Sequence, residues 1–257
     1  MKHTIDYKRE YDSERWIAYF DLLGITRLDE SGGKFGVFDA LSKAIEELRK
    51  QRSHDNEISF ARFSDTFIIY TKDDSDNSFC KIHIASQFFV FWLLQAGIPV
   101  TGAIACDRFY ADDRNDIYLG KGLIEAHEYG EAQDWIGFIL CPSAENKLSE
   151  YQLVATKFDY AYTRIPYKNK YTKKIPFVNI ARREKNKLKS NLPAFILGAG
   201  LTFCGNNSCL VKLKEMFKKH KDNPKDAKKY LRAINFIEEN KNQWRQTSVN
   251  EGAGNNS

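Results

Sequence analysis

Three observations predict a fold of mixed helices and strands, in the α/β or α+β class. Short apolar runs rich in β-branched and aromatic residues are interleaved with segments whose apolar residues recur at helical spacing. At 257 residues the chain is long enough to bury a core without disulfides or metals as staples. Its hydrophobic fraction of 42% and aromatic fraction of 14% are those of a globular protein. We therefore expect one substantial domain, alone or with a small appendage.

The first half of the chain reads as β-α-β-β-α-β-β-α-β. Short aromatic and β-branched runs predict strands at residues 16–23, 58–63, 66–71, 97–105, 117–119 and 135–140. Apolar spacing or helix-forming composition predicts helices at residues 35–48, 78–96 and 120–132. Ser78 is the expected N-cap of the second helix, because serine side chains accept hydrogen bonds from the first-turn N–H groups.

The second half is less regular. A short helix is expected at residues 143–148, extended segments at 160–165 and 175–180, and two helices at 210–221 and 224–240. The polar end of the chain, from residue 251, is expected to be disordered. This gives a main domain over residues 1–190, a helical C-terminal extension over 191–245 and a disordered tail over 246–257.

Charge and cysteine usage indicate a soluble, cytoplasmic protein. The net charge of +5 is a mild bias that suits an anionic ligand. The five cysteines are scattered and lack CxxC spacing, which is typical of reduced thiols. The N-terminus has no apolar signal region. The most apolar segment, residues 82–94, is shorter than the roughly 20 residues that span a bilayer, so we expect a buried or interface helix and no membrane contact.

Two aspartates each lie inside an apolar, strand-like run. Asp21 lies in the run at residues 16–24, and Asp65 in the run at 58–70. A carboxylate in such surroundings is costly to bury unless it is paired or binds a cation. If neighbouring strands bring the two together, their oxygens form a site for a hard divalent metal. The alternative is a capping or turn role, which is common for aspartate at strand ends.

The order of these elements resembles the catalytic domain of class III nucleotidyl cyclases. The matching motifs are Phe20-Asp21-Leu22-Leu23-Gly24 and Arg62-Phe63-Ser64-Asp65-Thr66-Phe67-Ile68-Ile69. Their aspartates stand 44 residues apart, the usual distance between that family's metal-binding aspartates. Segments 97–104, 118–127 and 133–137 look like a bacterial branch of stand-alone cyclase-like proteins, which includes the pyrimidine cyclases of phage defence. The resemblance covers residues 16–140 and, more loosely, 162–179.

The resemblance implies an α+β fold, with a ferredoxin-like cyclase-type sheet (βααββαβ core) and helices packed on it. It implies a metal-dependent nucleotide cyclase, which converts a nucleoside triphosphate to a 3′,5′-cyclic nucleotide and pyrophosphate. Within the bacterial branch, it suggests a pyrimidine cyclase in antiviral signalling. Two Mn²⁺ or Mg²⁺ ions per site would be held by Asp21, Asp65 and the main-chain carbonyl of Leu22. Since cyclase sites form between facing domains, a homodimer is expected, with the apolar segment at 88–94 in the contact.

Further residues are expected to bind the substrate. The turn Leu23-Gly24-Ile25 offers N–H groups to the phosphates, and Arg62 and Lys121 offer positive charge. An ion pair with an acidic neighbour is an equally good interpretation of Arg62. For Lys121, a surface position without a role in binding is the better interpretation.

The chain also departs from the family pattern. The helix at 120–132 lacks the Asn and Arg that class III cyclases carry one turn apart, and Thr101 stands where the branch often has arginine. Losing one transition-state cation costs roughly 3–4 kcal/mol, by comparison with an oxyanion donor. A catalytically inactive cyclase-like module for nucleotide sensing or partner binding is therefore the alternative function. Basic runs at 168–174, 182–189 and 212–229 leave nucleic-acid binding as a third, weaker one.

Overall fold

The computed structural model describes residues 13–23, 39, 41–43, 45–46, 58–153, 160–168, 188–189, 191–195 and 208–252. Its strands are β1 (Glu14–Leu22), β2 (Ile58–Phe63), β3 (Thr66–Thr71), β4 (Val100–Arg108), β5 (Tyr110–Asp112), β6 (Ile117–Leu119), β7 (Gly137–Leu140), β8 (Ala161–Arg164) and β9 (Asn191–Phe195). Its longer helices are α4 (Asp76–Gln95), α5 (Lys121–Ala132), α6 (Pro142–Glu150), α9 (Ser208–His220) and α10 (Pro224–Gly252).

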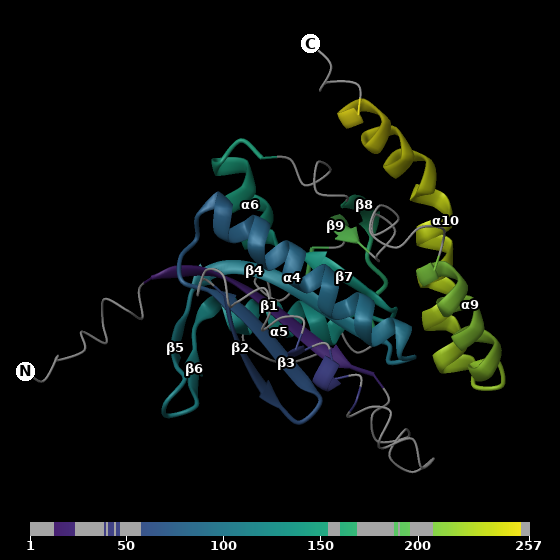
Figure 1. The fold of residues 1–257 in the computed structure, drawn as a ribbon, viewed down its shortest axis with the longest axis horizontal. Helices are drawn as coiled ribbons and strands as arrows, with labels where there is room; N and C mark the ends of the chain where they lie inside the picture. The colour runs from purple at the N-terminus through teal and green to yellow at the C-terminus, as the bar shows by residue number, and fades with distance from the viewer. Residues whose placement is uncertain are drawn as a thin grey trace, which may run out of the picture.

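Seven strands form one mixed sheet in the order β2-β3-β1-β4-β7-β9-β8, and β5 pairs with β6 in a separate hairpin. β1 lies between β3 and β4 and is antiparallel to both, whereas β4 and β7 run parallel. The predicted α+β fold, with helices packed on a sheet and a helical C-terminal extension, is confirmed (Figure 1).

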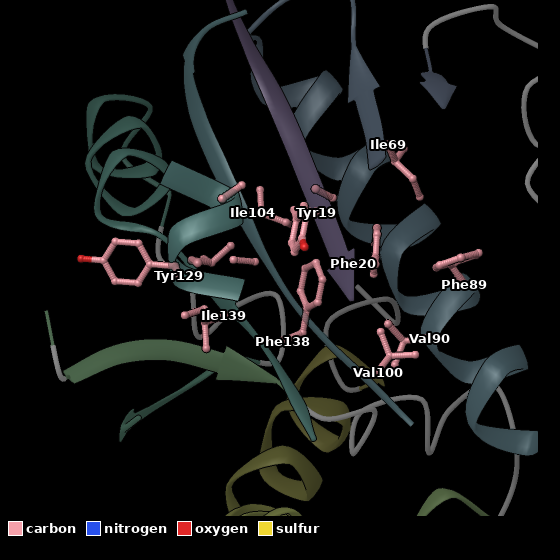
Figure 2. Close-up of a cluster of buried hydrophobic side chains, with 14 of the residues drawn as sticks. Tyr19, Phe20, Ile69, Phe89, Val90, Val100, Ile104, Tyr129, Phe138 and Ile139 are labelled. Atoms are coloured by element: carbon pink, nitrogen blue, oxygen red, sulfur yellow. The ribbon is translucent and has the colours of Figure 1, made fainter. Parts of the chain in front are cut away.

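α4 and α5 cover opposite faces of the sheet. Successive side chains of a strand point to opposite faces, so β1 supplies both layers of the core. On one face the Phe20 ring packs against Phe89 of α4, with centroids 4.9 Å apart. On the other face Tyr19 lies against Gly130 of α5, where an added Cβ would come within 2.6 Å of the tyrosine ring. Figure 2 shows these two sides of the core, with Tyr129 on the α5 side.

The apolar segment at 82–94 lies within α4 and faces the core. Phe89, Leu93 and Leu94 are at most 1% exposed. The segment is therefore the buried helix that its length predicts, and none of the described helices is both long and apolar enough to cross a membrane. α4 begins earlier than predicted. Its N-cap is Ser75, not Ser78, because the Ser75 hydroxyl accepts the Ser78 N–H at 3.2 Å.

The C-terminal region differs from the predicted division in two ways. The helical extension was expected from residue 191, but residues 191–195 form β9, a strand of the main sheet between β7 and β8. The sequence pattern did not predict this strand because it contains Pro193, and proline is disfavoured in the interior strands of a sheet. The tail was expected to be disordered from residue 246, but α10 continues to Gly252. Residues 241–251 contain no glycine or proline to end the helix.

Other predictions meet the described residues only in part. Of the helix expected at 35–48, residues 39, 41–43 and 45–46 are helical, and the remaining positions lie outside the described residues. The extended segment expected at 175–180 and the tail beyond Gly252 also lie outside them. Four of the five cysteines are described, and three of them, Cys80, Cys106 and Cys141, are free thiols.

Candidate functional site

The end of β1 and the β2–β3 turn bring Asp21 and Asp65 to the same edge of the sheet. Asp21 is the penultimate residue of β1 and pairs with Thr66 of β3 and Thr101 of β4. Asp65 lies in the turn, and its carbonyl oxygen accepts the main-chain N–H of Leu22 at 3.0 Å. The turn is thereby fastened to the residue that follows Asp21.

The surroundings of Asp21 disfavour its negative charge. The pKa of this carboxyl is raised to about 6, mainly by burial and also by the nearby carboxylates of Glu131 and Asp65, while Lys168 and Lys229 act in the opposite direction. A raised carboxyl pKa means that the folded protein holds the ionised form at a cost. A bound cation would offset that cost, so the electrostatics of this edge suit a cation site.

Glu131 is a third carboxylate at this edge, and no motif or spacing in the sequence distinguishes it from other surface glutamates. It is the penultimate residue of α5. Its Oε1 accepts the Tyr19 hydroxyl at 3.1 Å, and its Oε2 lies 3.9 Å from Nζ of Lys168. Because residue 130 is glycine, the last turn of α5 lies directly on the Tyr19 ring, which places Glu131 beside the end of β1.

Gln133 fixes the end of α5 against the sheet. Its buried Nε2 donates to the carbonyl oxygens of Gly102 at 2.9 Å and Tyr129 at 3.1 Å. Its Oε1 accepts the indole N–H of Trp135 at 2.7 Å. The motif Gln133-Asp-Trp-Ile-Gly137, one of the segments that carry the family resemblance, therefore has a structural role at this point of the fold.

Thr101 has a similar structural role. It is the β4 neighbour of Asp21 and is 1% exposed. Its hydroxyl donates to the carbonyl oxygen of Gly130 at 3.3 Å, which adds a second tie between β4 and the end of α5.

Two of the predicted substrate-binding residues lie away from Asp21. Arg62 is cross-strand from Phe67, whose ring stacks on Phe89 of α4, so register places Arg62 on the opposite face from Asp21. Lys121 is the exposed first residue of α5. Ten residues at 1.5 Å per residue separate it from Glu131 by about 15 Å.

The predicted phosphate-binding turn is described only at its start. Leu23 lies directly after β1, and its N–H donates to the carbonyl oxygen of Pro99 at 2.8 Å. Gly24 and Ile25 lie outside the described residues. The side chain of Leu22 is buried at 2% exposure, so its main chain alone is available to a ligand.

The donor set fits a hard divalent cation. Within the described part of the chain, no group of three or more His, Cys, Asp or Glu side chains is arranged to hold a metal. Mg²⁺ is usually bound by one or two carboxylates together with waters and substrate phosphates, and does not require an all-protein cage. Asp21 and Asp65, with the carbonyl of Leu22, match that smaller set of oxygen ligands.

The chain is similar in fold to several solved structures. No protein-family model matches the chain, and no curated protein matches it. The guanylate cyclase domain of RhGC from Catenaria anguillulae, solved with GTP, is 8% identical, with a TM-score of 0.47 over 71% of this chain and 94% of that one. An adenylate cyclase from Trypanosoma brucei is 10% identical, with a TM-score of 0.46 over 72% and 87%. The adenylyl cyclase CyaB from P. aeruginosa is 12% identical, with a TM-score of 0.42 over 70% and 91%.

Proposed function

We propose that the protein is a metal-dependent nucleotide cyclase, which converts a nucleoside triphosphate to a 3′,5′-cyclic nucleotide and pyrophosphate. The observation that supports this most is the meeting of Asp21 and Asp65 at one sheet edge, with Leu22 hydrogen-bonded to the turn that carries Asp65. The pyrimidine cyclases of antiviral signalling are the branch that the sequence motifs resemble, so CTP and UTP are the first substrates to test.

The reaction joins the ribose 3′-oxygen to the α-phosphorus and breaks the bond to the β-phosphate oxygen, which releases pyrophosphate. Bound Mg²⁺ or Mn²⁺ would lower the pKa of the attacking hydroxyl and neutralise charge on the leaving group. Asp21, Asp65 and the Leu22 carbonyl would hold the ions. The hydrogen bond from Leu22 to Asp65 supports this role because it joins the backbone segments that carry these ligands, and positioning supplies much of the acceleration in phosphoryl transfer.

The active form is proposed to be a homodimer. Of the segment at 88–94, four of seven residues are buried in the core and three are half-buried, so it offers little apolar surface to a partner. Exposed apolar residues on β2, β6 and α5, here called the apolar cluster, are a better surface. Leu119 of β6 is 54% exposed, Ile124 of α5 is 58% exposed and Phe63 of β2 is 46% exposed. Phe63 belongs to the cross-strand row that contains Thr66 and Asp21, so the Phe63 part of this surface lies near the site. A partner on this surface would bring a second set of side chains towards Asp21.

The direct test is turnover. Purified protein is incubated with each of the four ribonucleoside triphosphates and Mn²⁺, and products are identified by mass spectrometry. A cyclic mononucleotide and pyrophosphate are expected from the wild type. Asp21→Asn should lose both products. Asp116→Asn should keep them, because Asp116 is an exposed residue of the β5–β6 turn. If none of the four triphosphates is turned over, the cyclase proposal is wrong.

One observation favours a second candidate, a catalytically silent nucleotide-binding module. Helix α5, all of which is described, contains neither the Asn nor the Arg that the family pattern places there. Its single lysine, Lys121, lies about 15 Å from Glu131. This candidate predicts that a triphosphate with Mg²⁺ raises the melting temperature while no cyclic product forms. Detection of a cyclic product rules it out.

A further inference from the structure

The C-terminal helix α10 docks directly beside the Asp21 edge. Nη1 of Arg232 donates to both the side-chain Oδ2 of Asp134, at 2.5 Å, and its main-chain oxygen, at 2.6 Å. One turn further along, the Phe236 ring meets Trp135 edge to face, with centroids 5.2 Å apart. Asp134 and Trp135 follow the end of α5, so α10 is fastened to the segment that positions Glu131.

A third segment joins the same place. The N–H of Asp134 donates to the Pro166 carbonyl oxygen at 2.7 Å, and the N–H of Lys168 donates to the Ala132 carbonyl oxygen at 2.8 Å. These bonds hold the main chain of Lys168 beside the end of α5, with its ammonium 3.9 Å from Glu131. Three separate parts of the chain, at residues 131–135, 166–168 and 229–236, thus meet around this end of α5.

Lys229 lies three residues before Arg232, so it shares the face of α10 that meets Asp134. It is half-buried, and burial together with the charge of Lys168 lowers its pKa. Lys229 and Lys168 both interact electrostatically with Asp21. The two lysines thus place positive charge near the same carboxylate and act on each other, and an anion bound by both would relieve their mutual repulsion.

We propose that α10 is part of the site and that Lys229, with Lys168, forms a subsite for the phosphates of the ligand. Asp21 and Asp65 form the carboxylate side of the site, and the two lysines form its cationic side. The C-terminal extension thereby supplies positive charge that α5 does not carry near Glu131. The polyphosphate class of ligand rests on the proposed function, whereas the role of α10 in binding an anion does not require turnover.

The test measures binding of inorganic tripolyphosphate in the presence of Mg²⁺ by isothermal titration calorimetry. Lys229→Gln is expected to weaken binding about tenfold, the effect of removing one hydrogen-bond donor to a charged group. Lys228→Gln is the matched control, because it removes the same charge from an exposed neighbouring position of α10. Lys229→Arg is expected to restore most of the affinity, and Arg232→Gln to weaken binding as Lys229→Gln does, since it removes the contact that docks α10.

Two outcomes overturn the proposal: wild-type protein that does not bind tripolyphosphate, or a Lys229→Gln affinity equal to that of Lys228→Gln. Melting temperatures of all variants show whether each is folded. A wild-type protein that makes no cyclic nucleotide but loses tripolyphosphate binding on Lys229→Gln disproves the cyclase function and leaves the subsite standing. If the wild type makes a cyclic nucleotide but Lys229→Gln keeps its affinity for tripolyphosphate, the subsite is disproved and the cyclase function stands.

Discussion

The main-chain N–H of Leu22 donates to the carbonyl oxygen of Asp65 at 3.0 Å, and this bond joins the end of β1, which carries Asp21, to the β2–β3 turn, which carries Asp65. The bond involves main-chain atoms alone. Substitution of either aspartate side chain should therefore leave the turn in place and report on the carboxylates themselves.

Asp21→Asn is expected to have opposite effects on stability and activity. Because burial raises the pKa of Asp21 from 3.8 to about 6, its ionised form costs the metal-free protein up to about 3 kcal/mol at neutral pH. The neutral amide removes that cost, so urea denaturation in EDTA should show a more stable variant. Loss of a metal ligand should reduce Mn²⁺-dependent turnover by at least about 100-fold. A variant that is less stable in EDTA would show that Asp21 makes a structural contact instead.

Gln133→Ala is expected to destabilise the protein by about 2–4 kcal/mol, because it leaves the buried carbonyl of Gly102 and the indole of Trp135 without their side-chain partner. Urea denaturation measures the change. Lys121→Ala, at the exposed start of the same helix, is the control and should stay within about 0.5 kcal/mol of the wild type. Equal stability of the two variants would contradict the role assigned to Gln133.

The sequence was sufficient to predict the two aspartates but not their surroundings. Asp21 and Asp65 could be found because each interrupts an apolar run, which is a local signal. Glu131, Lys168 and Lys229 give no such signal, since each is an ordinary charged residue in a polar segment. Lys229 lies in the basic run at 212–229, whose pattern points to nucleic-acid binding and not to this site. Only the long-range contacts of α10 and of residues 166–168 bring these side chains to the site.

The same distinction explains the fold. β1 to β3 and α4 could be predicted because each is a local run rich in apolar residues, of strand or helix length, bounded by polar or turn residues. β9 could not, because its short sequence contains Pro193 and its place depends on pairing with β7 and β8. Strand pairing between distant segments is a tertiary property, which local sequence patterns do not determine.

His83 should make the stability of the protein depend on pH. It is buried, its Nδ1 lies 3.1 Å from the Tyr160 hydroxyl, and burial lowers its pKa from 6.5 to about 4. Between these pH values the unfolded chain binds a proton that the folded chain does not, so the free energy of unfolding falls as the pH falls below 6.5. The contribution of His83 is a loss of about 2 kcal/mol between pH 7.5 and pH 5.

His83→Gln keeps a hydrogen-bonding group beside Tyr160 but cannot titrate. Urea denaturation at pH 7.5 and pH 5 should show a smaller loss of stability in this variant than in the wild type. His220→Gln, at an exposed position of α9, should keep the wild-type difference. If His83→Gln shows the same loss between the two pH values as the wild type, the pH dependence comes from other groups.

Leu119→Glu tests the proposed dimer surface. Leu119 is 54% exposed, and Ile117, two residues before it on the same face of β6, is 41% exposed, so a charge at Leu119 would lie on an exposed apolar surface of this cluster. Burying an unpaired carboxylate in an interface is costly, so the variant should be monomeric in sedimentation velocity at concentrations where the wild type is a dimer. If the site requires both subunits, turnover should fall with the dimer fraction and recover as protein concentration is raised.

Val211→Glu, which places the same charge at a 52% exposed position of α9, should keep the wild-type assembly and turnover. A wild-type protein that is monomeric at high concentration, or a Leu119→Glu variant that still dimerises, would show that this cluster is not the interface.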